Sequence, residues 1–236
     1  MQISIVMPVY NEIGTIAEIM GRVLAAPVEI PKELIVVDDG STDGTREYLE
    51  DLLKGTGSAP ESAALKVLFH PHNRGKGAAI RTALTQATGE IILIQDADLE
   101  YDPQDYPALL KPILDGRADV VFGNRFHGGA HRVLYFWHAV GNQLLTILCN
   151  MVTNLNLADM EVGYKVFRAE VLKRIPLESS RFGFEPEITV KAAKLGCRIY
   201  EVPITYHGRT YAEGKKISWR DGLAAFIHIL RYRFKA

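Results

Sequence analysis

The sequence of 236 residues predicts an α/β fold in which one mostly parallel sheet is flanked by helices. Short apolar runs alternate with segments of helical spacing, and successive runs are far enough apart to leave room for a helix. Several runs end directly in acidic residues, as at Asp38 and Asp96. Strands that alternate with helices form parallel sheets covered on both faces, and such sheets bind ligands at the carboxyl ends of their strands.

The expected elements follow one another regularly along the first half of the chain. The run ISIVMPV at 3–9 is apolar almost throughout, which is typical of a buried strand. The segment 13–25 that follows has apolar residues at helical spacing. The small, polar stretch 55–63 is typical of a surface loop. We expect further strands at 33–38, 65–69, 91–95 and 120–123, and further helices that end at residue 53 or span 76–87 and 106–114.

The stretch IILIQDADLEYD at 91–102 carries the strongest functional signal. Its apolar run is followed by Asp96, Asp98, Glu100 and Asp102. Carboxylates so close to a core strand repel one another and lose solvation unless a cation lies among them. Mg²⁺ and Mn²⁺ take oxygen ligands of this kind and leave positions for water and phosphate. A solvated acidic turn is the alternative interpretation.

Two more segments are expected beside this one. Tyr10 to Glu12 and Asp38 to Asp43 also follow predicted strands, so all three should lie at one edge of the sheet. Scattered acidic turns would not recur at successive strand ends. The stretch from Asp39 to Glu50 has the ligand spacing of an EF-hand calcium loop, but such a loop follows a helix and this one follows a predicted strand.

The turn NRGKG at 73–77 resembles a loop that holds a phosphate group. Gly75 and Gly77 allow close approach of a ligand to the backbone, and we expect Lys76 to reach toward a nucleotide. The turn lacks the GxxxxGK[ST] pattern, so it is not a P-loop. A solvated lysine at the start of a helix is the alternative for Lys76.

Composition and termini exclude several classes of protein. The 27 basic and 28 acidic residues nearly cancel, so no global field attracts nucleic acid. Cys149 and Cys197 lie far apart without a CxxC pair, which argues against a disulfide framework or a zinc site. The opening MQISIVMPVYNE lacks the basic region of a signal peptide, and no run is apolar enough for a spanning helix. We therefore expect a cytoplasmic protein.

The chain changes character after residue 125. Between Arg132 and Asp159 there is no Asp, Glu, Lys or Arg, and apolar residues recur near helical spacing. The segment 219–234 has an apolar side with arginines beside it. Both segments are expected to be amphipathic helices that lie on a membrane surface or against the core of the protein. Between them, HGRTYAEGKKI at 207–217 is a basic loop that could close over phosphate groups, although a solvated loop has the same composition.

The motifs together resemble family 2 glycosyltransferases with a GT-A fold. MPVYNE, VVDDGSTDGT, NRGKGAA, DADLEYDP and GNR occur in the order and spacing of that family. NLADMEVGYKVFR, RFGFEPEI and YHGRTYAEGKKI are similar to the branch of dolichol-phosphate mannose synthases and bacterial polyprenyl-phosphate sugar transferases. The resemblance covers almost the whole chain. It implies a Rossmann-like sheet in a single GT-A domain, with 1–125 binding the nucleotide-sugar and 126–236 binding the acceptor.

The resemblance also implies roles for single residues. Asp98 and Glu100 would be ligands of Mg²⁺ or Mn²⁺ with help from Asp96, although the mannose synthases often carry Gln at the position of Glu100. Arg209 and Lys215 would bind phosphate groups.

Around the nucleotide-sugar, the resemblance implies that Asp39 reads the base and that Arg125 meets the diphosphate or the donor sugar. The other residues expected there are Pro8, Tyr10, Glu12, Val37, Lys76, Asp96 and Ala97. Core packing for Tyr10 and a surface ion pair for Arg125 are the alternatives.

We therefore expect a metal-dependent inverting glycosyltransferase that moves a hexose from a GDP- or UDP-sugar to a polyprenyl phosphate at the inner face of the cell membrane. A bound metal and the basic loop would stabilise the negative charge that develops on the departing diphosphate. A phosphate acceptor is already an anion and needs no general base. A hydroxyl acceptor would need one, and Asp159 or Glu161 would be the candidate.

Three alternatives remain open from the sequence. The enzyme could act on a hydroxyl group of a glycan or glycolipid. It could be a sugar-phosphate nucleotidyltransferase, although such enzymes usually begin with a glycine-rich loop and a basic signature that MPVYNEIGT lacks. It could also bind a nucleotide without turning over a donor, which the presence of Asp96, Asp98, Arg209 and Lys215 argues against.

Overall fold

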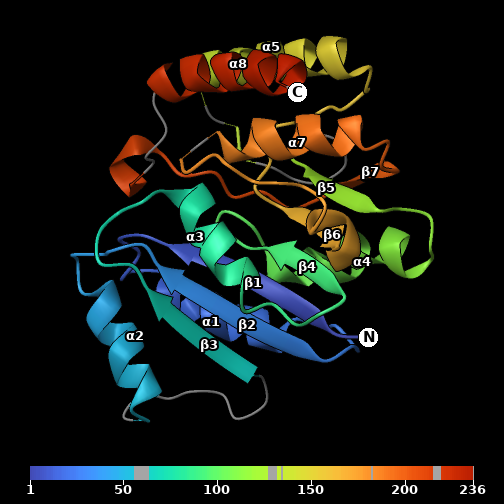
Figure 1. The fold of residues 1–236 in the computed structure, drawn as a ribbon. Helices are drawn as coiled ribbons and strands as arrows, with labels where there is room; N and C mark the ends of the chain where they lie inside the picture. Colours follow the sequence, from blue (N-terminus) through green and yellow to red (C-terminus); the bar gives the residue numbers. More distant parts are fainter. Residues whose placement is uncertain (56–63, 127–131, 134, 182, 215–218, 236) are drawn as a thin grey trace.

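One seven-stranded sheet forms the centre of the molecule (Figure 1). The structure is a computed structural model that describes residues 1–55, 64–126, 132–133, 135–181, 183–214 and 219–235. The strand order is β3-β2-β1-β4-β6-β5-β7, and neighbours run parallel except where β6 pairs antiparallel with β4 and β5. The expected mostly parallel sheet is confirmed. The strands are β1 (Ile3–Val9), β2 (Lys32–Asp38), β3 (Ala64–Phe69), β4 (Ile91–Ile94), β5 (Val120–Asn124), β6 (Lys165–Arg168) and β7 (Ile199–Pro203).

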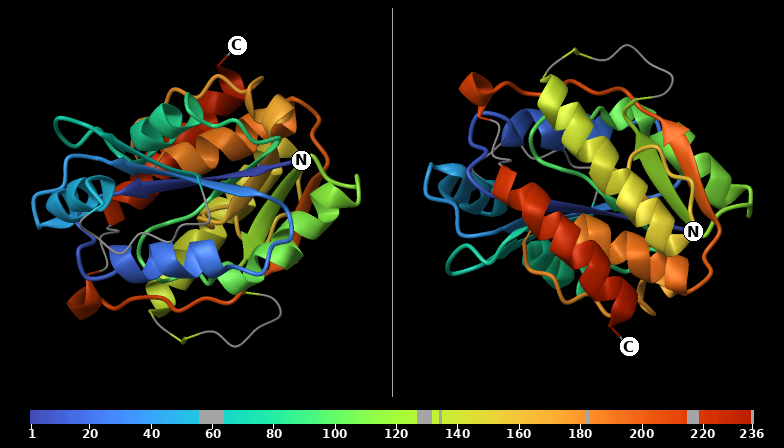
Figure 2. Two further views of the ribbon diagram at one scale, coloured as in Figure 1. Left: turned by 90° about the horizontal axis from the view of Figure 1, so that it is seen from below. Right: turned by 90° about the horizontal axis from the view of Figure 1, so that it is seen from above.

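Helices cover both faces of the sheet. α1 (Ile16–Ala25) and α3 (Lys76–Leu84) lie on opposite faces, and α4 (Tyr106–Leu114) packs against β5 and β6 on the side of α1 (Figure 2). α5 (Phe136–Thr153) and α8 (Trp219–Phe234) lie side by side at the top of Figure 1, and α7 (Phe184–Lys194) lies between them and the sheet. The remaining short elements are α2 (Thr45–Leu53), α6 (Ala169–Leu172), η1 (Pro103–Asp105) and η2 (Tyr211–Glu213).

The expected elements of the first half are present, with small differences at their ends. α1 begins at Ile16 because the residues before it form a turn, in which Asn11 has a φ of +53° and Thr15 N donates to Glu12 O at 3.0 Å. α3 ends at Leu84, three residues earlier than expected. Most of the expected loop 55–63 lies outside the described residues.

Because β6 runs antiparallel to β4, its first residue lies at the carboxyl end of β4. The chain enters the sheet at Lys165, which pairs with Ile94 at the carboxyl end of β4. The residues that precede β6 therefore lie beside the acidic turn that follows β4. At Gly163 a Cβ atom would fall 2.2 Å from Asp96 Oδ2, so a side chain there would displace Asp96.

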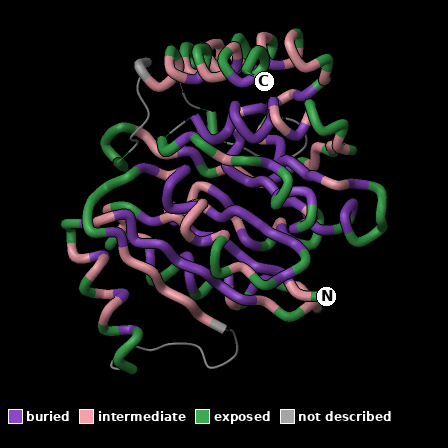
Figure 3. Tube along the Cα trace, viewed as in Figure 1, coloured by how far each residue is buried: buried purple, intermediate pink, exposed green. Residues whose placement is uncertain are grey.

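Burial follows the layers of the fold (Figure 3). β1, β2, β4 and β5 are almost wholly buried, as expected for strands covered on both faces. α5 and α8 differ, since each combines buried residues with large exposed apolar side chains. In the described part of the chain, no helix is long and apolar enough to cross a membrane.

Candidate active site

The three predicted segments meet at the carboxyl edge of β1, β2 and β4. Asp39 N donates to Val9 O at 2.8 Å, which joins the end of β2 to the end of β1. Thr15 Oγ1 donates to Ala97 O at 2.7 Å, which joins the turn after β1 to the acidic turn after β4. The expectation that polar strand ends converge is therefore met in the structure.

Arg209 lies among the carboxylates of this edge. Its Nη1 is 3.2 Å from Glu12 Oε2, and its Nη2 is 2.9 Å from Asp98 Oδ2. Its backbone N donates to Glu100 Oε1 at 2.8 Å. Tyr206, three residues earlier, donates its hydroxyl to Glu100 Oε2 at 3.1 Å. The loop after β7 is thus bound directly to the turn after β4, and one guanidinium serves three acidic side chains.

The backbone of the acidic turn is arranged to present Asp98 and Glu100 together. Leu99, the residue between them, has a φ of +58°, a conformation that a branched side chain seldom adopts and that costs about 1 kcal/mol or more. Burial, followed by the charges of Asp96 and Glu100, raises the pKa of Asp98 to about 7, although Arg209 acts in the opposite direction. The guanidinium therefore does not fully balance the negative charge of the turn.

The acidic turn has the right chemistry for a hard divalent cation, but its side chains do not converge on one point in this structure. Asp96, Asp98 and Glu100 offer only oxygen atoms, which Mg²⁺ and Mn²⁺ prefer. In the described part of the chain, however, no three His, Cys, Asp or Glu side chains converge closely enough to hold an ion as they stand. Arg209 lies against two of the three instead. Entry of an ion would require the guanidinium to move.

Lys76 bridges two carboxylates, the partly exposed Asp96 and the buried Glu185. Its Nζ lies 2.8 Å from Asp96 Oδ1 and 2.8 Å from Glu185 Oε1 on α7. Burial alone would lower the pKa of Lys76, but the two carboxylates raise it well above its usual value. The lysine is therefore a charged partner of Asp96, which ties the glycine-rich turn to the acidic turn.

Asp39 is enclosed by donors of the protein. His70 Nδ1 lies 2.6 Å from Asp39 Oδ1, and the backbone N atoms of Arg74 and Gly75 donate to Oδ1 and Oδ2 at 2.9 and 2.7 Å. His70 was not among the residues expected at this site. The signal was present, because His70 is a polar residue directly after the strand β3.

Arg125 and Asp159 form a second buried ion pair. Arg125 Nε and Nη2 each lie 2.6 Å from an oxygen of Asp159, and the guanidinium lies 5.2 Å from the ring centre of Tyr206. The Asp159 side chain is fully buried, and Asn142 Nδ2 also donates to it at 3.3 Å. Asp159 could therefore act as a base only after Arg125 releases it. The alternative expectation for Arg125, a surface ion pair, is therefore wrong, because its partner Asp159 is fully buried.

The other expected residues differ in their access to solvent. Tyr10 is 37% exposed, so it is not a core residue, whereas the side chain of Val37 is fully buried. Pro8 lies within β1, and Ala97 is buried beside Thr15. Lys215 lies outside the described residues, so its expected position stays a prediction, as do the roles assigned to all these residues.

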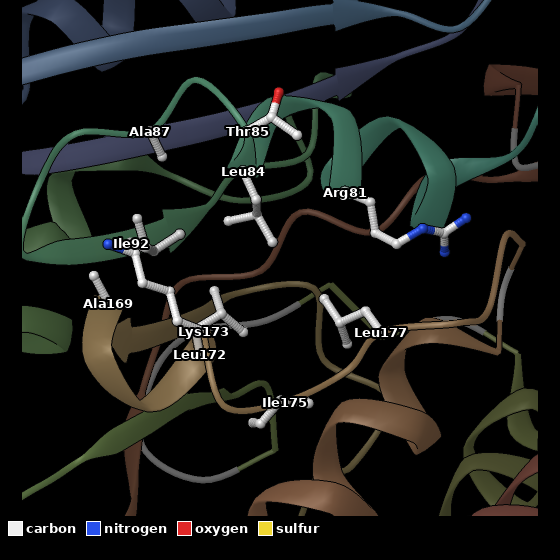
Figure 4. Close-up of a pocket in the computed structure, with 10 residues that line it drawn as sticks. All are labelled: Arg81, Leu84, Thr85, Ala87, Ile92, Ala169, Leu172, Lys173, Ile175 and Leu177. Atoms are coloured by element: carbon white, nitrogen blue, oxygen red, sulfur yellow. The ribbon is translucent and has the colours of Figure 1, made fainter.

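A separate apolar cavity of about 360 Å³ lies away from these residues (Figure 4). It is lined by side chains of α3, β4 and α6 and of the segment that follows α6, such as Leu84, Ile92 and Leu172. Ile92 belongs to the first half of β4, and the acidic turn follows the other end of that strand. None of the expected site residues that the structure describes lines the cavity.

Comparisons with known proteins agree with the geometry. The family model described as "Glycosyl transferase family 2" matches residues 4–176. The undecaprenyl-phosphate mannosyltransferase of Micrococcus luteus is 32% identical over 246 residues, which cover 100% of this chain and 96% of that protein. The dodecaprenyl-phosphate galacturonate synthase of Rhizobium johnstonii is 31% identical over 220 residues, which cover 91% of this chain but only 62% of that protein.

Solved structures support the same fold. Glucosyl-3-phosphoglycerate synthase from Mycobacterium tuberculosis, in complex with Mn²⁺, UDP and phosphoglyceric acid, superimposes with a TM-score of 0.73 at 22% identity, covering 99% of this chain and 78% of that chain. The same enzyme with Mg²⁺ and UDP gives a TM-score of 0.70 at 23% identity, covering 98% and 79%. At this level of identity the likeness concerns the fold, and the expected GT-A architecture is confirmed.

Proposed function

This chain belongs to glycosyl transferase family 2, and from that premise we propose that it is a metal-dependent inverting transferase that moves a hexose from a nucleotide-sugar to a polyprenyl phosphate. The names of the relatives from Micrococcus luteus and Rhizobium johnstonii support this class of acceptor. Of the two, the first is matched over nearly its whole length.

One observation carries the proposal: Arg209 reaches from the C-terminal part of the chain to the carboxylates at the strand ends. A glycosyl transfer needs the donor diphosphate and the acceptor in one place. Arg209 belongs to the part of the chain that is proposed to bind the acceptor. Its pairing with Asp98 and Glu12 joins that part to the strand ends that are proposed to bind the donor. A protein that only bound a nucleotide would not need this second element.

The proposed donor site lies along the ends of β1 and β2. Tyr10 is accessible for stacking, and Glu12 and Asp39 offer carboxylate oxygens to the sugar and base of the nucleotide. Pro8, Val37 and Ala97 would complete the walls of this site. Lys76 would hold Asp96 in place through its 2.8 Å contact instead of meeting the nucleotide freely in solvent.

Asp96, Asp98 and Glu100 are the residues that would hold Mg²⁺ or Mn²⁺. Such an ion, when bound, supplies positive charge to the diphosphate as its bond to the sugar breaks. Arg209 would have to leave these carboxylates before they could hold such an ion. Arg209 and Lys215 would then be available to contact phosphate oxygens of the donor and the acceptor.

The acceptor would attack the face of the sugar opposite to the diphosphate, which inverts the anomeric configuration. A phosphate monoester has a second pKa of about 6 and is largely ionised at neutral pH. No general base is required, which agrees with the engagement of both Asp159 oxygens by Arg125. A hydroxyl acceptor would require a base, and Asp159, one of the two carboxylates expected in that role, is held by Arg125.

The outer face of α5 and α8 is proposed to lie on the inner surface of the cell membrane, where a polyprenyl phosphate is embedded. Trp137, Leu144 and Met151 recur at seven-residue intervals along α5 and are 77%, 62% and 77% exposed. α8 adds Leu223, Ile227 and Phe234, which are 54%, 55% and 79% exposed, with Arg231, Arg233 and Lys235 nearby. Exposed apolar residues beside basic ones favour an anionic lipid surface.

The direct test supplies GDP- and UDP-sugars with either a polyprenyl phosphate or free hydroxyl acceptors, each with and without Mn²⁺. We expect sugar transfer to the lipid phosphate only when the metal is present, and loss of that transfer in Asp98→Asn. Product on a hydroxyl acceptor alone would reject the proposed acceptor. Undiminished transfer by Asp98→Asn would reject the proposed metal site.

A further inference from the structure

His70 has no role in the proposed reaction, yet its ring is joined to the residue proposed to meet the base. The residue is 3% exposed, and its backbone N donates to Asp38 O at 2.8 Å. Its Nδ1 lies 2.6 Å from Asp39 Oδ1, and its Nε2 lies 2.9 Å from Thr82 Oγ1 on α3. Both ring nitrogens are engaged within the protein, by Asp39 and by Thr82, so any effect of the ring on binding must pass through Asp39.

Among the described residues, the hydrogen bonds of Asp39 leave it one vacant acceptor position. A carboxylate oxygen accepts about two hydrogen bonds. Oδ1 receives His70 Nδ1 and the backbone N of Arg74, so it is saturated. Oδ2 receives the backbone N of Gly75 at 2.7 Å and keeps one position. His70 thus decides which oxygen remains available.

The two backbone donors belong to a turn that cannot adjust easily. A Cβ atom on Gly40 would lie 2.8 Å or less from the backbone of His72 and Asn73. A Cβ atom on Gly75 would lie 2.2 Å from Ser180 O. The backbone on both sides of Asp39 is therefore closely packed. The ring of His70 is the side-chain contact through which the carboxylate orientation can be changed without rebuilding the turn.

We propose that His70 is a positioning residue that sets the base selectivity of the donor site. When His70 Nδ1 holds the Asp39 carboxylate in place, one acceptor position remains. That position suits a ring N–H group, which uracil has at N3 and guanine has at N1. Cytosine N3 and adenine N1 carry a lone pair instead and are repelled by the carboxylate. Without His70 the carboxylate can turn and accept exocyclic amino groups, which all bases except uracil possess. This inference rests on the proposed function, because it requires Asp39 to meet the base.

Two substitutions separate the two hydrogen bonds of the ring. The amide nitrogen of His70→Asn comes close to the position of Nδ1 and can donate to Asp39. The longer side chain of His70→Gln brings its amide close to the position of Nε2, where it meets Thr82 but not Asp39. The two variants therefore serve as controls for each other, because both carry an amide but one keeps the bond to Asp39 and the other keeps the bond to Thr82.

The test measures binding of UDP, GDP, CDP and ADP in the presence of Mn²⁺ by calorimetry, together with thermal unfolding of each variant. We expect wild type to favour UDP or GDP over CDP and ADP by about 30-fold or more, since a mismatched polar group is strongly rejected. His70→Gln should reduce this ratio by about tenfold and raise the donor KM with little change in kcat, whereas His70→Asn should stay within about threefold of wild type.

A ratio unchanged in His70→Gln would overturn the inference. Equal losses of affinity and of melting temperature in both variants would do the same, because they would show a purely structural histidine. If wild type bound none of the four nucleotides, the proposed function itself would fail, and this inference with it. Wild-type binding and variant selectivity are separate readouts, so the two failures are distinguishable.

Discussion

The guanidinium of Arg209 lies where the carboxylates of the strand ends need positive charge. It pairs with Glu12 and Asp98 at 3.2 and 2.9 Å, and its Nε is 3.6 Å from Glu100. A divalent ion would be attracted by the same carboxylates. Arg209 and the metal are therefore expected to compete until a diphosphate arrives to accept the arginine.

We predict that Arg209→Gln binds Mn²⁺ more tightly than wild type when no nucleotide is present. Removal of the competing charge should strengthen binding by roughly tenfold, or about 1.4 kcal/mol, as measured by calorimetry. Sugar transfer should fall sharply, since the phosphate contact is lost. Arg132→Gln is the control, because Arg132 pairs with Glu213 and not with the acidic turn. Unchanged or weaker Mn²⁺ binding by Arg209→Gln would contradict the competition.

The carboxyl group of Glu161 is buried, and its Oε1 has no hydrogen-bond partner among the residues that the structure describes. Burial and then the charge of Glu185 raise the pKa of Glu161 to about 8, against the influence of Lys165 and Arg125. In the unfolded chain the pKa is about 4.3. Between these values the folded protein keeps a proton that the unfolded chain has lost. This carboxyl group therefore lowers stability as pH rises from about 5 to 8.

Glu161→Gln should remove this pH dependence. The variant should match wild type near pH 5 and be more stable near pH 8, with the wild-type free energy of unfolding falling by up to about 1.4 kcal/mol more per pH unit than that of the variant. Burial lowers the pKa of Lys165 to about 8, but that group affects stability above pH 8 and not in this window. Urea unfolding in EDTA at several pH values tests the prediction. Parallel curves would show that Glu161 is ionised in the folded protein.

For single residues, the sequence predicts which side chains lie at the same edge of the sheet but not which of them form ion pairs. Arg209 and Glu12 are 197 positions apart, and no local pattern connects them. The strand-end rule placed Asp39, Asp96 and Asp98 at one edge because parallel strands share their direction. The bond between Arg125 and Asp159 depends on how the second half of the chain returns to the sheet, which periodicity does not report.

Among the helices, α5 and α8 combine a buried stripe with an exposed apolar one. Cys149 and Thr146 face the core on α5, and Ala225, Ile229 and Tyr232 do so on α8. The sequence left a membrane surface and the protein's own core as alternatives for these helices. The structure shows that each helix uses one side for the core and leaves apolar residues exposed on another. The exposed stripe is what the proposed membrane contact would bury.

Replacement of Trp137 and Ile227 by Glu should prevent binding to anionic vesicles without unfolding the protein. Each glutamate adds an unfavourable charge to the lipid contact and removes apolar area worth about 25 cal/mol per Å². We expect the vesicle-bound fraction to fall by about tenfold in a flotation assay. Leu53→Glu with Leu114→Glu is the matched control, since these leucines are 52% and 45% exposed on α2 and α4, away from α5 and α8 (Figure 1). Equal losses in both double variants would argue against a defined membrane face.

The strands show why sequence patterns succeed in one half of the chain and not in the other. β1, β2 and β4 are buried on both faces, so their apolar runs are continuous and easily recognised. β6 begins at Lys165, a fully buried lysine that donates to Met160 O at 3.0 Å and to Val162 O at 2.5 Å. β7 is half exposed and mixed in character. Neither gives a recognisable strand signal, and the antiparallel insertion of β6 follows from the path of the chain.

Across the whole molecule, two parts of the chain build one edge. The first half supplies the strand ends and the acidic turn, and the second supplies β6, β7 and the loop that carries Arg209. Lys76 connects them again by pairing with Asp96 and with Glu185 of α7. A ligand that binds at this edge therefore contacts elements from both halves. It should stabilise the protein as a unit, because only the folded state holds them together.

We predict that the nucleoside diphosphate and the metal stabilise the protein jointly. A ligand at 100 times its dissociation constant adds about 2.7 kcal/mol, which in a protein of this size raises the melting temperature by roughly 5–10 °C. UDP or GDP with Mn²⁺ should give such a rise, whereas the same nucleotide in EDTA should give much less, because the diphosphate would then face Asp96, Asp98 and Glu100 without a cation between them. In Asp98→Asn the two conditions should give nearly equal, small rises. A full rise in EDTA would show that Arg209 and the backbone hold the diphosphate without a metal, and the cation would then have no place in donor binding.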